Sequence, residues 1–291
     1  METLIGFLLP VGGAVVIIAF MVIKDIIKQR RAIKNWKDYT GPIMDILGCE
    51  YETITDAADT TVVMNRYKDL LSQGKMMGFT PVAFFPDKEL YETLQKFILM
   101  DDYAYTRKSI IEEAAIVNVA EFLADRIEKY DIKVDGAPVT DGIQPENEFV
   151  TLLDMRSWRP KKEAPEPPLY PVIVIAKIPT RNPWEVAAWL PMGGVMDCPQ
   201  PHQQVAIYKH WHETHGAFPA VVSEDAWELY VERPAATQAD ATRLAKEICA
   251  FNPDNFKKSE EDQENLVNDY VAVLLHSSTW YLWWNMIDWS E

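Results

Sequence analysis

The chain has 291 residues, of which 48% are hydrophobic and 25% are charged. This composition provides enough apolar side chains for packed cores and excludes a disordered or collagen-like chain. The net charge is −16, so the sequence disfavours binding to the phosphate backbone of nucleic acids. Its three cysteines, Cys49, Cys198 and Cys249, form no CxxC pair and no disulfide framework, which indicates a reducing compartment.

Residues 3–23 form an uncharged, mostly apolar run of 21 residues. A helix crosses the hydrocarbon core of a bilayer in about 20 apolar residues, so this run is long enough to span a membrane. A cleaved signal peptide is the alternative. It would have a basic leader and an A-x-A-like cleavage site, and neither flanks the run. The sequence therefore predicts a transmembrane anchor.

A basic segment follows the run, with six basic residues and one acid between residues 24 and 37. Because this segment carries +5 and Glu2 carries −1, the net charge of −16 leaves −20 on residues 38–291. Basic flanks stay on the cytoplasmic side of a membrane and contact anionic lipid headgroups. We therefore expect a single-pass protein of the bacterial inner (plasma) membrane, with a short N-terminus outside and its acidic part in the cytoplasm.

The cytoplasmic part is expected to consist of two soluble units. Prolines among charged residues at 158–168 predict an extended linker. Before this linker lie the anchor and basic segment at 1–37 and a helix-rich α/β unit at 38–157, and after it lies a second α/β unit at 169–291. Both units belong to the α/β (α+β) class, and each is expected to form a mixed sheet flanked by helices.

The first unit is predicted to contain helices at 62–71, 88–99 and 106–130, with a buried strand at 78–85. Asp87 is placed to cap the second of these helices. The run at 106–130 has the strongest amphipathic pattern of the chain, with apolar side chains on one face and acidic ones on the other. The sequence of this unit suggests no catalytic set.

Strands alternate with helices in the second unit. It opens with an apolar strand at 170–176, and a short helix begins at Pro183. The remaining predicted elements are a helix at 203–215 that ends at Gly216, strands at 218–223 and 226–232, a helix from Thr237 to Cys249, a helix from Ser259 to His276, and a final strand at 279–289. This alternation predicts an α/β sandwich with a mixed sheet.

All five histidines lie in the second unit, three of them between His210 and His215. On a helix, His212 and His215 share a face, and a metal- or thiol-dependent hydrolase would use them together with Cys198. The spacing differs from the i, i+4 histidine pair of zincins, and no cysteine-hydrolase signature surrounds Cys198. The alternative is structural, with imidazoles near a helix C-terminus and a partly buried loop cysteine.

Tryptophan and acidic residues supply the candidate binding surface. Nine of the ten tryptophans lie at or after Trp158. The final strand is apolar on both faces, which is typical of a central core strand or of a strand that presents one aromatic face to a groove. The candidate binding residues are Trp211, Asp225, Glu228, Arg233, Glu247, Asp254, Trp280, Trp283 and Trp284.

Several short motifs occur in order over roughly residues 170–285. They are Tyr170-Pro-Val172, Asp197-Cys-Pro199, Asp225-Ala-Trp-Glu228, Asn252-Pro-Asp254 and Trp280-Tyr-Leu-Trp-Trp-Asn285. With these motifs the second unit resembles a bacterial family, the domain of unknown function 4253. Where the resemblance implies acidic side chains, this chain has Phe218 and Asn285, which weakens the case for a cation site. The resemblance implies no particular activity.

The sequence thus favours a membrane-anchored, cytoplasm-facing protein-interaction module over an enzyme. An acidic surface would steer a basic partner, as in an immunity-like role, and aromatic side chains would supply affinity. The alternatives are the hydrolase that uses Cys198, His212 and His215, and a structural subunit of a membrane complex. We predict no cofactor, no metal and no nucleic-acid partner, and we expect contact with the lipid bilayer through the N-terminal helix.

Overall fold

The computed structural model describes residues 37–55, 60–98, 103–134, 145–149, 172–193, 197–223, 225–253 and 260–284. The predicted anchor at 3–23 and the predicted linker at 158–168 lie outside these residues. Within them, no helix combines the length and the apolar character that crossing a membrane requires.

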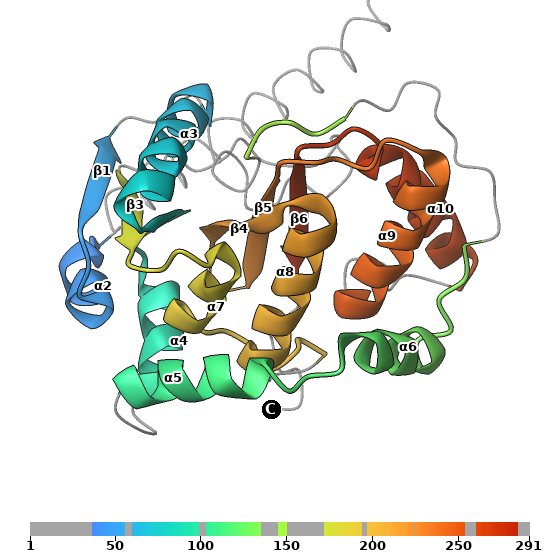
Figure 1. Cartoon of the computed structure of the whole chain (residues 1–291), viewed down its shortest axis with the longest axis horizontal. Helices are drawn as coiled ribbons and strands as arrows, with labels where there is room; N and C mark the ends of the chain where they lie inside the picture. Colours follow the sequence, from blue (N-terminus) through green and yellow to red (C-terminus); the bar gives the residue numbers. More distant parts are fainter. Residues whose placement is uncertain are drawn as a thin grey trace, which may run out of the picture.

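The elements of the described part of the chain are shown in Figure 1. The strands are β1 (Tyr51–Thr55), β2 (Thr80–Phe84), β3 (Val172–Ile178), β4 (Ala217–Val222), β5 (Ala226–Val231) and β6 (Thr279–Trp283). The helices are α2 (Thr40–Leu47), α3 (Thr60–Met77), α4 (Lys88–Ile98), α5 (Tyr103–Ala114), α6 (Val119–Lys129), the short η2 (Pro183–Glu185) and α7 (Val186–Trp189), α8 (Pro201–His215), α9 (Gln238–Phe251) and α10 (Glu260–Leu274).

These strands form one sheet in the order β1-β3-β2-β4-β5-β6. Strands β2 and β4 are parallel, and every other neighbouring pair is antiparallel. In the centre of β3, Ala176 lies opposite Tyr51 of β1 on one side and Val82 of β2 on the other. The mixed α/β class is confirmed, with one mixed sheet in the described residues.

The expectation of a separate sheet in each unit is wrong for these strands. Strand β3 follows the predicted linker, yet both of its neighbours in the sheet precede it. Its residues Ile173 to Ala176 are buried. A buried strand needs a hydrogen-bonded neighbour on each side, because its backbone groups have no water to bind. The first unit supplies both neighbours, so the two predicted units share one sheet.

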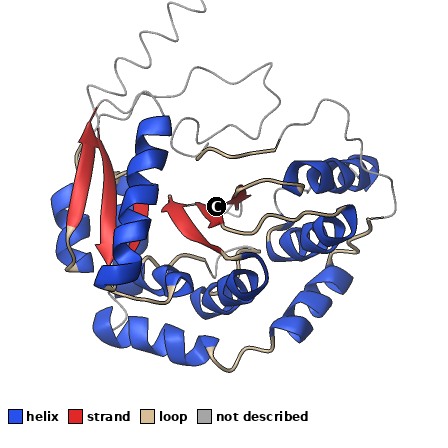
Figure 2. Ribbon diagram, turned by 45° about the horizontal axis from the view of Figure 1, so that its top comes forward, coloured by secondary structure: helices blue, strands red, loops and turns tan. Residues whose placement is uncertain are grey.

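The two faces of the sheet are covered differently. Helix α3 and Phe149 pack on one face, against residues such as Ala83, Ile175 and Phe218. The other face is covered by α2 and by the helices from α4 to α10, many of which form an arc around the sheet (Figure 2). Most of the buried apolar side chains therefore belong to this second, thicker layer.

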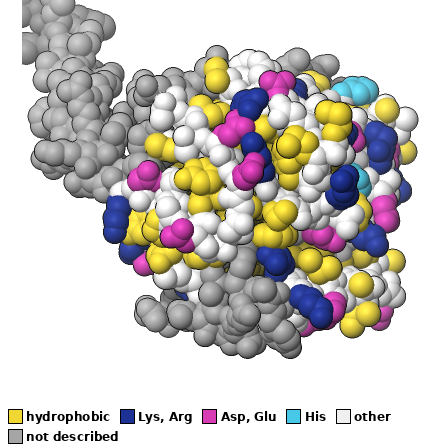
Figure 3. Space-filling model, turned by 60° about the vertical axis from the view of Figure 1, so that its left-hand side comes forward, with side chains coloured by type: hydrophobic (Ala, Val, Ile, Leu, Met, Phe, Trp, Pro, Cys, Tyr) yellow, Lys and Arg dark blue, Asp and Glu magenta, His cyan; other side chains and the backbone are white. Residues whose placement is uncertain are grey.

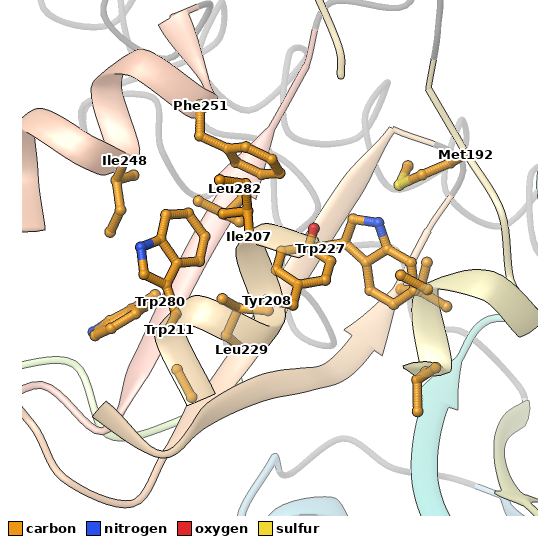
Figure 4. Close-up of a cluster of buried hydrophobic side chains, with 14 of the residues drawn as sticks. Met192, Ile207, Tyr208, Trp211, Trp227, Leu229, Ile248, Phe251, Trp280 and Leu282 are labelled. Atoms are coloured by element: carbon orange, nitrogen blue, oxygen red, sulfur yellow. The ribbon is translucent and has the colours of Figure 1, made fainter. Parts of the chain in front are cut away.

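An aromatic core lies between the sheet and helices α8 and α9 (Figure 4). Trp211 of α8 meets Trp280 of β6 edge to face, with ring centroids 5.9 Å apart, and meets Phe251 of α9 at 5.2 Å. Edge-to-face contacts match the positive edge of one ring to the negative face of another. Trp280 and Trp284 are almost fully buried. Trp280 and Trp284 are therefore core residues, as the core interpretation expected, but β6 pairs with β5 alone and is not a central strand among the described strands.

Local sequence signals place several helix ends as expected. Gly216 ends α8 in the left-handed conformation, with φ of 63°. The hydroxyl oxygen of Thr237 caps α9 by accepting from the backbone N–H of Asp240 at 3.2 Å. The carboxylate of Asp87 caps α4 in the same way, by accepting from the N–H of Leu90 at 2.8 Å. Each of these signals acts within one turn of helix, which is why sequence alone reveals it.

The single helix expected at 106–130 is wrong, because the chain forms two helices there, α5 and α6. Asn118 begins α6 as its N-cap, with a side-chain oxygen that accepts from the N–H of Glu121 at 3.3 Å. An asparagine side chain competes with backbone hydrogen bonds inside a helix and favours an N-cap instead. The break lets α5 pack against α8 while α6 packs against α9.

Candidate functional site

An open groove of about 680 Å³ lies between α6, α8 and α9, and we call it the α6 groove. One of its walls is apolar. Val119, Leu123 and Ile127 of α6 line this wall together with Ala120 and Ala124, whose side chains are exposed. Because alanine is small, a ligand can approach the surface of α6 closely at these two positions.

The opposite wall of the groove is charged. It is lined by Lys209, His210 and Glu213 of α8 and by Arg243, Lys246 and Glu247 of α9. Residues three or four apart lie on one face of a helix, so both helices present these side chains to the groove. Arg243 pairs with Asp240 at 2.5 Å. Lys209 and Lys246 have no ion-pair partner among the residues that the structure describes.

Glu247 connects the groove with the aromatic core. Its Oε2 atom accepts from Nε1 of Trp211 at 2.9 Å and lies 3.2 Å from Nε2 of His210. Burial acts to raise the pKa of Glu247, but the contacts with His210 and Trp211 outweigh it and lower that pKa. Glu247 is therefore ionised and already hydrogen-bonded, whereas Lys209, Lys246 and Glu213 keep charged groups without an ion-pair partner among the described residues.

The predicted binding residues do not form one surface. Those with almost no exposed area are Trp211, Glu228, Trp280 and Trp284. Arg233 lies at the C-terminus of α8, where its Nη2 atom donates to the backbone oxygens of His212 and Glu213 at 2.9 and 3.0 Å. Asp254 lies outside the described residues. Glu247 lines the α6 groove, and Asp225 and Trp283 meet elsewhere.

Asp225 and Trp283 meet at the carboxyl ends of the parallel strands β2 and β4. Nε1 of Trp283 donates to Oδ2 of Asp225 at 2.7 Å, and the Ser223 hydroxyl donates to its Oδ1 at 2.9 Å. Burial raises the pKa of Asp225. Burial also raises the pKa of Asp87 to about 6, and the nearby charge of Asp225 acts in the same direction. Two partly buried carboxyl groups therefore influence each other at this end of the sheet.

Our sequence reasoning missed the relation between Asp87 and Asp225. Each follows the last residue of its strand, Phe84 or Val222, by three positions. Ligand sites in α/β sheets form at the carboxyl ends of parallel strands, so this shared position was the available signal. Both carboxylates are held by hydrogen bonds within their own turns. We therefore assign the pair to the pH dependence of the fold and not to catalysis.

The three residues of the hydrolase alternative are not brought together. Cys198 lies just before α8, where its sulfur is 3.6 Å from Nε2 of Gln204. His212 and His215 are in the last turn of the same helix, which rises about 1.5 Å per residue. The length of α8 thus separates the thiol from the imidazoles. In the described part of the chain, no group of His, Cys, Asp or Glu side chains could hold a metal ion.

The sequence did not single out the lysines or the alanines of the α6 groove. On a predicted helix, Lys209 and Lys246 look like ordinary solvated residues. The available signal was the exposed pair Ala120 and Ala124 next to Ile116, on a helix whose other exposed positions are mostly charged. Their role depends on the packing of α6 against α8 and α9, which no local pattern contains.

The described residues define a mixed α/β fold with an aromatic core and an open, half-apolar groove. Residues 174–285 of the chain match the model of the family described as Domain of unknown function (DUF4253). The resemblance stated from the motifs is confirmed for this C-terminal part. No curated protein and no solved structure matches the chain. The matched residues include α8 and α9, whereas α6 lies before them.

Proposed function

We propose that this chain is a membrane-anchored, cytoplasm-facing module that binds an amphipathic helix of a partner protein in the α6 groove. The observation that carries the proposal is the apolar wall on α6 opposite a charged wall on α8 and α9. A helix with one apolar face and one polar edge matches both walls. The uncharged run at 3–23 and the basic segment after it support the membrane-anchored part of the proposal.

The apolar wall supplies most of the affinity in this proposal. Ala120 and Ala124 leave room for a partner's side chains to reach Leu123 and Ile127. Ile116, in the turn before α6, is 85% exposed and extends the apolar surface beyond the groove. Removing apolar surface from water contributes about 25 cal/mol per Å². A partner helix that covers α6 and this turn would therefore bury side chains that are now exposed.

The charged wall determines which sign of charge fits best on the polar edge of the partner helix. Among the groove side chains that have no ion-pair partner in the described residues, the basic Lys209 and Lys246 outnumber the acidic Glu213, and Glu247 is already hydrogen-bonded. We therefore expect acidic residues along the polar edge of the partner helix. This differs from the basic partner that the net charge of the chain suggested. Long-range repulsion from that net charge is screened within about 8 Å at physiological ionic strength, so the local lysines determine the fit.

The structure bears differently on the two alternative functions, the hydrolase and the structural subunit of a membrane complex. No observation favours the hydrolase, because Cys198 is separated from His212 and His215 by the length of α8. The structural-subunit alternative is a special case of the proposal, in which the partner is itself an integral membrane protein. An immunity-like role is the other case, with a soluble partner. The identity of the cross-linked protein in the experiment below distinguishes them.

Site-specific photo-cross-linking of the full-length protein in its own membrane tests the proposal. A benzophenone amino acid replaces Ala124 in the groove, and in a second sample it replaces Ala239, an exposed alanine of α9 that does not line the groove. We expect one cross-linked protein from position 124 and none from position 239. The cross-linked peptide should be an amphipathic helix with acidic residues. The same cells should retain the protein in membranes after alkaline extraction, and deletion of residues 3–23 should release it.

A filled groove provides the matched control. Ala120→Trp adds a large side chain to the apolar wall, and Ala239→Trp adds the same side chain to an exposed helix position elsewhere. The cross-link from position 124 should disappear with Ala120→Trp and persist with Ala239→Trp. Cross-linking that is equal from both positions, or that survives Ala120→Trp unchanged, would overturn the proposal.

A further inference from the structure

A second, smaller pocket of about 330 Å³ lies at the opposite end of the parallel strands from Asp87 and Asp225. Phe79 precedes β2, Phe218 lies in β4, and both line the pocket. Lys75 of α3 and Arg181, in the turn after β3, add two positive charges. Elements from both sides of the predicted linker therefore build the pocket, which has the volume of a small-molecule site.

The charges of the pocket are not balanced. Nζ of Lys75 lies 2.7 Å from Oε1 of Glu232, so these two charges neutralise each other. The guanidinium of Arg181 has no hydrogen-bond or ion-pair partner in the part of the chain that the structure describes. An unpaired guanidinium presents a fork of N–H donors that fits a carboxylate or a phosphate. The described residues that line the pocket thus carry one uncompensated positive charge.

The Arg181 guanidinium lies close to the backbone at Gly78. Gly78 has φ of +89°, and a β-carbon built on it would lie only 3.0 Å from Nη2 of Arg181. Glycine is favoured by the left-handed backbone, and its missing β-carbon leaves room for the guanidinium. Hydrogen bonds between Thr180 and Asn182 shape the turn that carries Arg181. Arg181 is exposed and lines the pocket.

His212 lines the pocket as a neutral group. Its ring lies 5.0 Å from the ring of Trp184 and 5.8 Å from that of Phe218, measured between centroids. Burial lowers the pKa of His212, with the charge of Glu232 acting in the opposite direction. Its Nδ1 atom is buried without a hydrogen-bond partner among the described residues. A buried polar atom of this kind is stabilised by a ligand that offers it a partner.

We infer that this pocket binds a small organic carboxylate, with the carboxylate group on Arg181 and the apolar body against Phe79 and Phe218. One negative charge balances the single uncompensated charge of the pocket. A phosphate dianion would leave an excess negative charge beside Glu232, which disfavours it. The inference does not depend on the α6 groove, because the two cavities share no lining residue.

Titration of the detergent-solubilised full-length protein with benzoate, followed by ligand-observed NMR, tests this inference. Benzyl alcohol has the same ring without the charge, and inorganic phosphate has the charge without the ring. We expect saturable binding of benzoate alone. Arg181→Gln should weaken that binding at least tenfold, because it removes the uncompensated charge. Glu232→Gln should strengthen it several-fold, because it leaves Lys75 unpaired. Opposite effects from two glutamine substitutions are specific to the charge balance of this pocket.

Arg243→Gln is the matched control, since Arg243 is an exposed arginine that lines the other cavity. It should leave benzoate binding unchanged, and so should Ala120→Trp, which fills the α6 groove. Comparing variants in one detergent cancels any partition of benzoate into micelles. Equal weakening by Arg181→Gln and Arg243→Gln, weaker binding after Glu232→Gln, or binding of phosphate without benzoate would each overturn the inference.

Discussion

Residues 174–285, which match the family model, and residues 37–134, which precede them, contribute differently to the sheet. Strands β4, β5 and β6 of the matched part pair with one another, but β3, at its start, pairs with β1 and β2 of the preceding part. Strand β2 lies between β3 and β4. The matched part by itself is therefore an interrupted sheet. The limits of the family match are therefore not the limits of the sheet in this molecule.

The two parts also differ in what they contribute to the interior and the surface. The matched part buries the large aromatic side chains Trp211, Trp227 and Trp280. The preceding part adds β1, β2 and helices that complete both cavities, with α6 lining the α6 groove and α3 lining the smaller pocket. Apolar and charged side chains are mixed over the face that carries β1 and α3 (Figure 3). Each cavity thus needs both parts of the chain.

The largest effect on folding is expected when the matched part is separated from the part that precedes it. Residues 172–291 alone should lose cooperative unfolding, whereas residues 37–291 should unfold in one transition. The physical reason is that β3 loses both hydrogen-bonded neighbours and that the helical layer of the core is left incomplete. Urea denaturation followed by near-ultraviolet circular dichroism measures this. A cooperative transition with native aromatic signals from residues 172–291 would show that the family part folds by itself.

The contrast between the two parts also explains what sequence could predict. The ends of α4, α8 and α9 follow from Asp87, Gly216 and Thr237, because a cap acts within one helical turn. The buried character of β3 and of β6 follows from their apolar runs. The insertion of β3 between β1 and β2 could not be predicted from the sequence. Strand order is set by packing between segments that lie far apart in the chain.

The candidate sites show the same limit. His212, His215 and Cys198 attract attention because their residue types are chemically active, yet α8 holds the thiol at one end and the imidazoles at the other. Lys209 and Lys246 attract none, because exposed lysines are common on helices. They become candidate ligand contacts only when α6 forms the facing wall. Residue type predicts chemistry in a sequence, but only the fold decides which side chains face a common space.

A smaller change in stability is expected from Asp87→Asn, which should increase the free energy of unfolding at neutral and alkaline pH. In the folded state the pKa of Asp87 is raised from its usual 3.8 to about 6, first by burial. The folded state thus binds this proton more tightly than the unfolded state, and stability falls as the pH rises from about 4 to about 6. That difference corresponds to about 3 kcal/mol. Asparagine keeps the cap and removes the charge, so the variant should be more stable than the parent at pH 8 and similar to it near pH 4.

The measurement for Asp87 is the free energy of unfolding from urea titrations at several pH values. Asp69→Asn, at an exposed position of α3, is the control and should change stability by less than about 0.5 kcal/mol. A parent protein whose stability does not fall between pH 4 and 6 relative to Asp87→Asn would contradict the prediction.

The smallest change in the free energy of unfolding is expected when the contact between α6 and the matched part is weakened. Arg126 of α6 donates from Nε to the backbone oxygen of Ala250 at 2.6 Å and from Nη2 to that of Asp197 at 2.8 Å. Arg126→Met keeps the apolar stem of the side chain and removes these donors, so the partly buried carbonyl groups lose their partners. We expect a loss of about 2 kcal/mol in the free energy of unfolding, which remains a single transition.

Lys129→Met separates this effect from a general loss of charge on α6. Lys129 is an exposed neighbour that pairs with the side chain of Asp197 at 3.3 Å, and such surface pairs contribute less than about 1 kcal/mol. Urea unfolding of both variants gives the comparison. If Arg126→Met costs no more than Lys129→Met, apolar packing alone holds α6 in place. If it costs more, as we expect, the arginine fixes the wall of the α6 groove against α9, and Arg126→Met should also weaken the cross-link from position 124.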